Sequence, residues 1–164
     1  MKRNESILLL DLTQGAMIAA LYVVLTFIAN LAGLASGVIQ VRLSEVLTIL
    51  PVFTAAAVPG LAVGCVLANL LTGCALWDVV FGSLATLIGA LGTRLLRKKS
   101  PVLAVLPPIL SNMFIVPLVL QQVYGVEDAF WYLMLTVGAG EIISCGALGL
   151  LLYRSLKKTR IFDR

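Results

Sequence analysis

Apolar residues fill most of the chain, and glycine, proline and charged residues divide them into six segments. These segments cover about residues 12–31, 41–57, 60–71, 77–96, 102–124 and 129–153. Segments 41–57 and 60–71 are short for a hydrocarbon layer of about 30 Å, so we expect kinks or irregular backbone facing a cavity there. The pattern predicts an all-α integral membrane protein, a bundle of six transmembrane helices in a single membrane domain, 1–164.

The composition supports a membrane location. Hydrophobic residues make up 60% of the 164 residues, charged residues only 12%, and the mean hydropathy is +1.05. A soluble domain of this length could not bury so much apolar surface. The N-terminus carries Lys2 and Arg3 before an apolar run of about twenty residues, which is longer than the core of a signal peptide. We therefore expect it to be the retained first span.

The basic residues predict the orientation. Eleven of the twelve Lys and Arg residues lie before the first span, in the last turn of the fourth or just after it, or after the sixth. With six spans these three clusters fall on one side, which the positive-inside rule makes cytoplasmic, together with both termini. Arg42 is the exception, because it lies on the outer side.

The polar residues of the spans gather in the outer half of the predicted membrane. Glu141 comes about 15 Å below Trp131 if that tryptophan marks the interface. The other polar residues in this half are Gln40, Arg42, Glu45, Asn69, Asp78, Asn112 and Gln121. This distribution predicts a polar cup that opens outward and has Glu141 at its floor.

Glu141 is the first candidate for ligand binding, because an ionisable residue within a span is costly and usually functional. The alternative is a protonated carboxyl bonded to a neighbouring helix. Arg42 and Glu45 are three residues apart, so they share a helix face and could pair with each other or with Asp78 instead of a ligand. Asp78 could also cap the fourth span.

Asn112 follows two prolines, so it could bond a ligand or cap the carbonyls that the prolines free. Trp77 and Trp131 fit an interfacial aromatic belt, and either ring could stack on a planar ligand. Ala16 and Ala20, with Gly15 and Ala19 offset by one, form a small-residue stripe on which another helix could dock.

Enzyme and cofactor chemistry lack the residues they need. The chain has no His, and its three cysteines have no zinc-binding spacing. Ser44 and Ser83 have no nearby base, and no glycine- and lysine-containing phosphate loop is present. We therefore predict a protein that is not an enzyme, holds no cofactor or metal and binds no nucleic acid.

Three consecutive blocks carry a family resemblance: VRLSEVLTILPVFT, PGLAVGCVLANLLTG and WDVVFGSLATLIGAL. Their order and spacing resemble the QueT family of queuosine-precursor transporters, which are substrate-binding (S) subunits of energy-coupling-factor (ECF) importers. The resemblance extends from about Gln14 through the sixth span. Ala55 departs from the family pattern, where a proline is expected, but it lies at a cytoplasmic turn away from the predicted pocket.

The resemblance implies uptake of queuine or an aminomethyl deazaguanine across the bacterial plasma membrane. Glu141 would accept the two adjacent donors of the guanine-like edge, and Asn112 and Gln121 would satisfy the rest of the ring. Asp78 or Glu45 would suit the cationic aminomethyl group, and the loop at residues 32–40 would act as a lid. The stripe at Ala16 and Ala20 would dock on the transmembrane coupling subunit, which two ATPase subunits drive.

Three alternatives remain at this point: an S subunit for another vitamin-like molecule, a structural subunit without a ligand, and an autonomous channel or carrier. The structural subunit predicts that the buried polar residues satisfy one another and that no cavity exists. The autonomous carrier predicts transport without ATPase partners.

Overall fold

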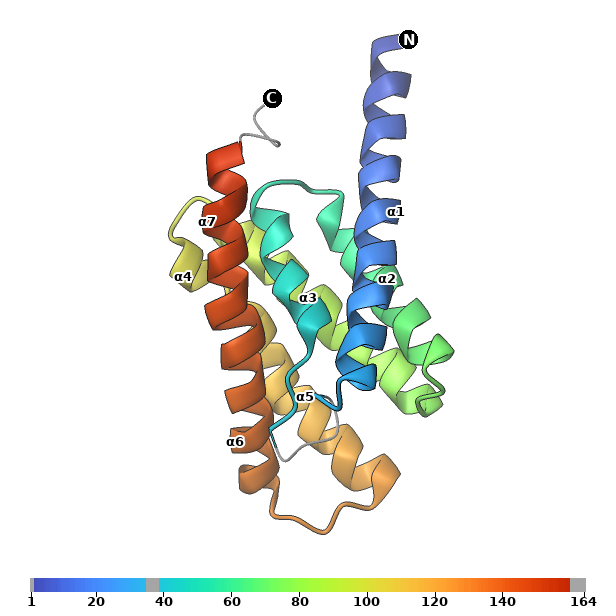
Figure 1. The fold of residues 1–164 in the computed structure, drawn as a ribbon, viewed down its shortest axis with the longest axis vertical. Helices are drawn as coiled ribbons and strands as arrows, with labels where there is room; N and C mark the ends of the chain where they lie inside the picture. The colour runs from blue at the N-terminus through green and yellow to red at the C-terminus, as the bar shows by residue number, and fades with distance from the viewer. Residues whose placement is uncertain (1, 35–38, 160–164) are drawn as a thin grey trace.

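The computed structural model describes residues 2–34 and 39–159, with side chains from Ser6 onward. Within these residues the chain is helical and contains no strand (Figure 1). The elements are α1 (Lys2–Leu31), η1 (Leu43–Val52), α2 (Ala57–Leu71), η2 (Asp78–Gly82), α3 (Ser83–Leu96), α4 (Pro101–Ala104), α5 (Leu106–Tyr124), α6 (Phe130–Glu141), η3 (Ile142–Leu148) and α7 (Gly149–Thr159). The predicted all-helical class is confirmed.

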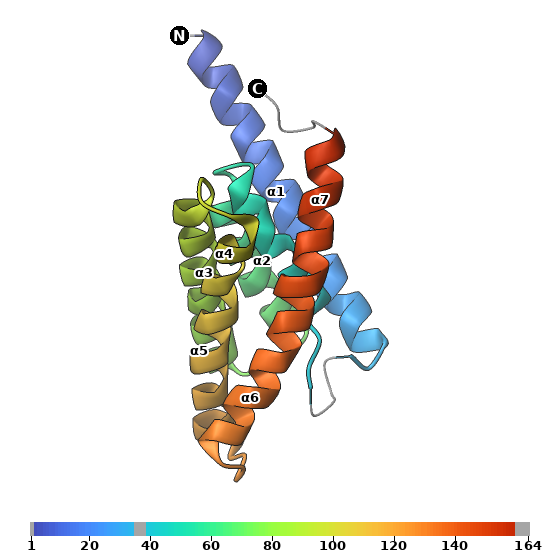
Figure 2. The same ribbon diagram turned by 90° about the vertical axis from the view of Figure 1, so that its left-hand side faces the viewer.

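The helices lie roughly along one long direction. α6, η3 and α7 follow one another as a single rod that runs the length of the molecule, and α1 packs on α2 while α5 packs on α3 and α6 (Figures 1 and 2). The N-terminal end of α1 and the C-terminal end of α7 lie at the same end. An even number of crossings places both termini on one side, so this arrangement agrees with the predicted topology.

Four helical stretches are long and apolar enough to cross a membrane: Ser6–Leu31, Asp78–Leu96, Pro101–Tyr124 and Phe130–Thr159. The other two apolar helices are η1, with 10 residues, and α2, with 15 residues. At a rise of about 1.5 to 2 Å per residue, each of these spans only about 20 Å. The six apolar segments exist as predicted, but the second and third do not cross a full bilayer as regular helices.

The second segment is a 3-10 helix instead of the transmembrane α-helix expected over residues 41–57. Its entry at Arg42 is extended, with φ −98° and ψ 100°, and Pro51 near its end has no N–H to donate. Inside it, the Thr48 hydroxyl donates to the carbonyl of Glu45 at 2.6 Å. Seven of its ten residues are buried, so tertiary packing keeps this tight helix in the middle of the bundle.

Pro59 and Gly60 divide the segments 41–57 and 60–71, and this pair predicts a tight turn, but the prediction is wrong because both residues lie in the first turn of α2. Proline is tolerated there because the first helical N–H groups have no partner within the helix. Gly60 and Gly64 then face α1, where an added Cβ on Gly64 would lie 2.8 Å from Cβ of Tyr22. The glycine pair therefore serves internal packing and lets α1 approach α2 closely.

The fifth segment breaks at Val105, between α4 and α5. Pro108 has no N–H for the carbonyl of Ala104, four residues earlier. The buried hydroxyl of Thr93, from α3, donates to that carbonyl at 2.7 Å. The carbonyl of Ala104 that the break leaves free is thus bonded by a neighbouring helix, and Asn112 does not cap it.

Candidate ligand-binding site

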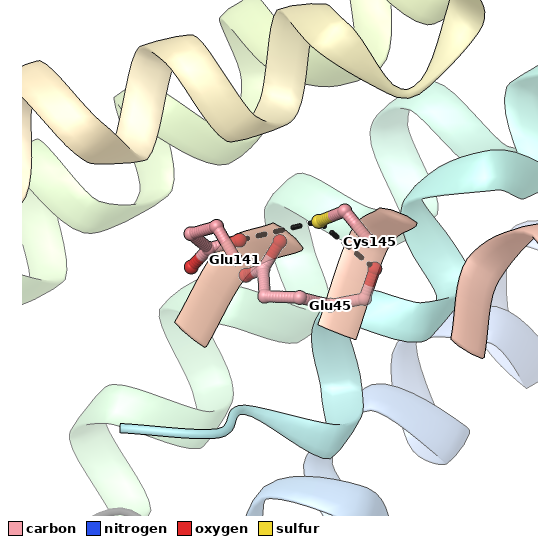
Figure 3. Close-up of side chains that lie close together, drawn as sticks. All are labelled: Glu45, Glu141 and Cys145. Carbon is pink, nitrogen blue, oxygen red and sulfur yellow. Dashed lines mark hydrogen bonds between the residues drawn. The ribbon is translucent and has the colours of Figure 1, made fainter. Parts of the chain in front are cut away.

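Two carboxylates lie buried side by side in the centre of the bundle (Figure 3). Glu45 from η1 is 1% exposed and Glu141 from the end of α6 is 3% exposed. Cys145, one turn after Glu141, joins the Glu141 side chain to the Glu45 backbone: its Sγ donates to Oε2 of Glu141 at 3.2 Å and is 3.5 Å from the carbonyl oxygen of Glu45. The η1 segment and the α6–η3 rod therefore bring together two acids that are far apart in the sequence.

Tyr22 and Arg42 surround this carboxylate pair. The Tyr22 hydroxyl, from α1, donates to Oε1 of Glu45 at 2.5 Å. The backbone N–H of Arg42 donates to Oγ of Ser144 at 3.1 Å, and the Arg42 charge acts on both carboxylates. The guanidinium thus supplies much of the charge compensation that two buried acids need.

Two buried polar atoms beside the pair, Oε2 of Glu45 and Nδ2 of Asn112, make no hydrogen bond of ordinary length and geometry among the described residues, although the Asn112 amide lies close enough to act on both carboxylates. Asn112 is 1% exposed and lies next to both carboxylates. Leaving a buried polar group unpaired costs about 1–3 kcal/mol. An unpaired acceptor and an unpaired donor at the same place therefore destabilise the empty protein, and a bound ligand that pairs with both would remove this cost.

A cavity of about 340 Å³ lies next to this cluster. That volume falls in the range of about 300–1,000 Å³ typical of small-molecule pockets. Its walls come from the ends of α1, α2 and α5, the segment before η1, and η2, and they include Tyr22, Thr26, Asn30, Gln40, Arg42, Ser44, Asn69, Cys74, Asp78 and Tyr124. Tyr22 and Arg42 both line the cavity; the Tyr22 hydroxyl also bonds Glu45, and the carbonyl of Arg42 accepts from the N–H of Glu45 at 3.0 Å, so these two residues connect the open volume with the cluster.

Asp78 forms a second polar group on the wall of this cavity. Its Oδ2 accepts a hydrogen bond from the Tyr124 hydroxyl, and its carbonyl accepts one from Nδ2 of Asn69 at 3.0 Å. The Tyr124 hydroxyl also accepts from the N–H of Ala75 at 3.3 Å. The cavity therefore has a cationic side at Arg42 and an anionic side at Asp78.

A second cavity of about 280 Å³ adjoins the first, and Gln40 and Leu120 contribute to both. Its remaining walls come from α6 and the segment before it, including Val126, Asp128, Tyr132, Leu133, Thr136 and Val137. Gln40 is consequently the polar residue shared by the two open volumes.

The predicted site residues fall into three groups. Gln40, Arg42, Asn69 and Asp78 line the larger cavity, and Glu45, Asn112 and Glu141 form the cluster behind it. Gln121, Trp77 and Trp131 line neither of the two cavities in the described part of the chain. Nε2 of Gln121 donates to the carbonyl of Asp128 at 2.8 Å, while Trp77 is 56% exposed and Trp131 is 70% exposed. Their contact with a ligand stays a prediction, as does the lid, since residues 35–38 lie outside the described residues.

Sequence reasoning missed Tyr22, Cys145 and Tyr124. Tyr22, Thr26 and Ala29 are spaced four and three residues apart on one face of α1, and all three line the cavity. Cys145 follows Glu141 by four residues, so the helical period also places it on the same face. These spacings could be recognised in the sequence. However, nothing in an apolar first span distinguishes a tyrosine that binds a carboxylate from one at the lipid surface.

Glu45, Glu141 and Cys145 are the described residues that could hold a metal ion, since their ligand atoms lie within 4.8 Å of one another. However, the thiol already donates to Glu141, and Arg42 places a positive charge on the same two acids. Because a positive charge already acts on this donor set and Oε2 of Glu45 still lacks a donor, the arrangement suits an organic ligand with several N–H donors better than a metal.

Comparison with known proteins agrees with this architecture. Residues 12–158 match the QueT transporter family. A Lactococcus lactis subsp. cremoris (strain MG1363) protein named queuosine precursor transporter QueT is 37% identical over 79 residues, which are 48% of this chain and 46% of that relative. The match thus spans about half the length of the curated relative, and no solved structure matches the chain. The family match covers most of the apolar helices, so the chain belongs to the QueT transporter family and is a multi-pass membrane protein.

Proposed function

We propose that this chain is the substrate-binding subunit of an ECF importer and captures a queuosine precursor, queuine or an aminomethyl deazaguanine. The relative's name supplies the ligand class. The observation that carries the proposal is the pair of unpartnered atoms, Oε2 of Glu45 and Nδ2 of Asn112, beside Glu141. A structural subunit without a ligand would have those groups satisfied and would need no cavity.

The chemistry of the ligand complements these atoms. A guanine-like edge presents a ring N–H and an exocyclic NH2 side by side, next to a carbonyl. The carboxylates of Glu141 and Glu45 accept the two kinds of N–H, and Asn112 donates to the carbonyl. Hydrogen bonds to charged acceptors in a dry interior are the strong ones, so this edge supplies both affinity and discrimination.

Access to the carboxylates requires movement of the residues in front of them. Tyr22 and Arg42 line the cavity, whereas Glu45, Glu141 and Asn112 do not. The ligand therefore enters the larger cavity first, and its N–H groups then replace the Tyr22 hydroxyl on Oε1 of Glu45. Exchanging one donor for another keeps Oε1 of Glu45 bonded during this step, and a second N–H of the ligand reaches Oε2, which has no partner in the empty site.

The opposite wall of the cavity would hold the cationic part of an aminomethyl precursor. Asp78 offers its carboxylate there, and Tyr124 already donates to one of its oxygens. The volume of about 340 Å³ accommodates one bicyclic ring with a short appendage. Asn69, which donates to the carbonyl of Asp78, provides a further polar contact beside it.

Delivery depends on partners outside this chain. Ala16 and Ala20 are exposed on α1, so the stripe is free to dock on a transmembrane coupling subunit that two ATPases drive. The basic ends of the helices support a cytoplasmic location of both termini in a bacterial cell, and the cavity then opens to the exterior. Ligand release inside would then follow from ATP-driven movement of the whole subunit.

Calorimetry on the detergent-purified chain tests the proposal, with queuine, the aminomethyl precursor and guanine as ligands. Glu141→Gln should weaken binding by about 1.5–3 kcal/mol, because it removes a charge-assisted hydrogen bond. Glu127→Gln, at an exposed position before α6, is the matched control and should bind as the unaltered chain does. Unchanged affinity in Glu141→Gln would remove this residue from the site, and no binding by the unaltered chain would refute the proposed ligand.

A further inference from the structure

Gly140 makes the closest backbone approach of any glycine in the described chain. A Cβ added to it would lie 2.0 Å from the carbonyl oxygen of Gln40 and 3.0 Å from the carbonyl carbon. Both atoms belong to backbone, so they cannot rotate away as the end of a side chain would. Gly140 immediately precedes Glu141, and the segment before η1 therefore rests on the bare backbone of the helix that carries this carboxylate.

A second contact holds the same segment, residues 40–42, one turn further along the helix that carries Gly140. Ser144 is 0% exposed, and its Oγ accepts the backbone N–H of Arg42 at 3.1 Å. Residues two apart in an extended segment are separated by about 6.6 Å. Residues four apart on a helix are separated by about 6 Å along the axis. Gln40 and Arg42 thus match the spacing of Gly140 and Ser144, so the two contacts act together.

The fastened residues are those that shape the ligand site. Gln40 is part of the wall of both cavities, and Arg42 lines the larger one while its charge acts on Glu45 and Glu141. Because the extended segment has no helix of its own, its place depends on what it rests on. A shift of the segment by even 1 Å would move both side chains relative to the carboxylates.

We propose that Gly140 and Ser144 form a seat for residues 40–42 and are positioning residues for ligand binding, which they support without touching the ligand. This inference rests on the proposed function. Gly140 sets how closely the segment approaches the helix, and the Ser144 hydroxyl sets its register. Together they hold Arg42 across the two carboxylates and Gln40 between the two cavities.

Matched glycine substitutions in one helical rod test the seat. Gly140→Ala and Gly146→Ala both gain helix propensity. They differ in space, since the nearest atoms to a Cβ on Gly146 are 3.8 and 4.0 Å away. By calorimetry with queuine, Gly140→Ala should bind about tenfold or more weakly, while Gly146→Ala should stay within about twofold of the unaltered chain. Equal losses in the two variants, or an unchanged affinity in Gly140→Ala, would overturn the proposal.

A double-substitution cycle in the ligand-free protein tests the same seat independently of the ligand. Ser144→Ala should lower the Tm by about 2–4 °C, because it removes the acceptor for the N–H of Arg42. In the Gly140→Ala background the segment is already displaced, so the second substitution should lower the Tm no further. Additive Tm losses would overturn the seat. If the Tm losses are non-additive but the unaltered chain does not bind queuine, the proposed seat for residues 40–42 still holds and the proposed ligand is refuted.

Ser144→Thr distinguishes positioning from packing. It keeps the hydroxyl, so it should retain more ligand affinity than Ser144→Ala, although it adds a methyl group at a fully buried position. Should Gly140→Ala fail to fold, this pair still tests the hydrogen bond. Equal affinities in Ser144→Thr and Ser144→Ala would show that the hydroxyl does not position Arg42.

Discussion

The unpaired amide of Asn112 leads to an unusual expectation: its removal should stabilise the empty protein and weaken ligand binding. Asn112 is 1% exposed, and its Nδ2 has no partner in the described structure. Replacing it by leucine, a side chain of similar length without polar atoms, removes a desolvation cost of about 1–3 kcal/mol. If about 1 kcal/mol survives repacking, the Tm of the ligand-free protein should rise by about 2–4 °C for a chain of this size.

The same substitution should weaken queuine binding by about 1–3 kcal/mol, a factor of roughly 5 to 150 in affinity, because the ring carbonyl then enters the site without a donor. Thermal unfolding in detergent with and without queuine, together with calorimetry, measures both quantities. Ser111→Ala is the control, since this buried hydroxyl has a partner, the carbonyl of Pro108 at 3.1 Å. It should lower the Tm and leave the affinity unchanged.

A Tm that falls as far in Asn112→Leu as in Ser111→Ala would contradict this expectation. That result would mean that the Asn112 amide is satisfied in the empty protein, for example by a buried water, and that it is not held open for a ligand. A raised Tm with unchanged affinity would refute only the contact between Asn112 and the ligand.

Three further expectations concern the surroundings of the carboxylates. Tyr22→Phe should destabilise the ligand-free protein by about 1–3 kcal/mol, because it removes the 2.5 Å hydrogen bond to Glu45 and leaves a buried carboxylate oxygen unpaired. A Tm equal to that of the unaltered chain would contradict this expectation. Cys74 is exposed on the wall of the larger cavity, while the other two cysteines are buried. Maleimide should therefore label the Cys74 thiol, and bound queuine should slow this labelling. Equal labelling rates with and without queuine would place the ligand elsewhere. Gly64→Ala should lower the Tm by the equivalent of about 1–3 kcal/mol, since the new Cβ would meet that of Tyr22 at 2.8 Å; Gly146→Ala, which has room, is its control.

The helical class and the six apolar segments were predictable because hydrophobic period and turn residues act locally. The conformation of the second segment was not, although its shortness pointed to irregular backbone. Its 3-10 geometry depends on Pro51, on the extended entry at Arg42 and on burial from all sides. Likewise, Pro59 and Gly60 indicate a turn in isolation, but both fit the first turn of α2, where Gly60 lies against Gly15 of α1.

Much of the candidate site was also predictable, because each buried polar residue in an apolar chain stands out. Seven of the ten predicted binding residues line the larger cavity or form the cluster behind it. The aromatic contributors were harder to choose. Trp77 and Trp131 have large rings that could stack on a planar ligand, but both side chains are exposed. Tyr22, within the apolar first span, instead bonds Glu45.

The amino-acid sequence by itself determined that this is a helical membrane protein with costly polar groups near one end, because transfer energies and helical periodicity depend on composition and local spacing. Only the tertiary structure decided which of those groups meet. Glu45 and Glu141 are 96 residues apart in the sequence, and their neighbours Tyr22 and Asn112 come from two further elements, α1 and α5. Which donor faces which acceptor depends on the approach of backbones, such as Gln40 against Gly140, and local spacing cannot specify that distance.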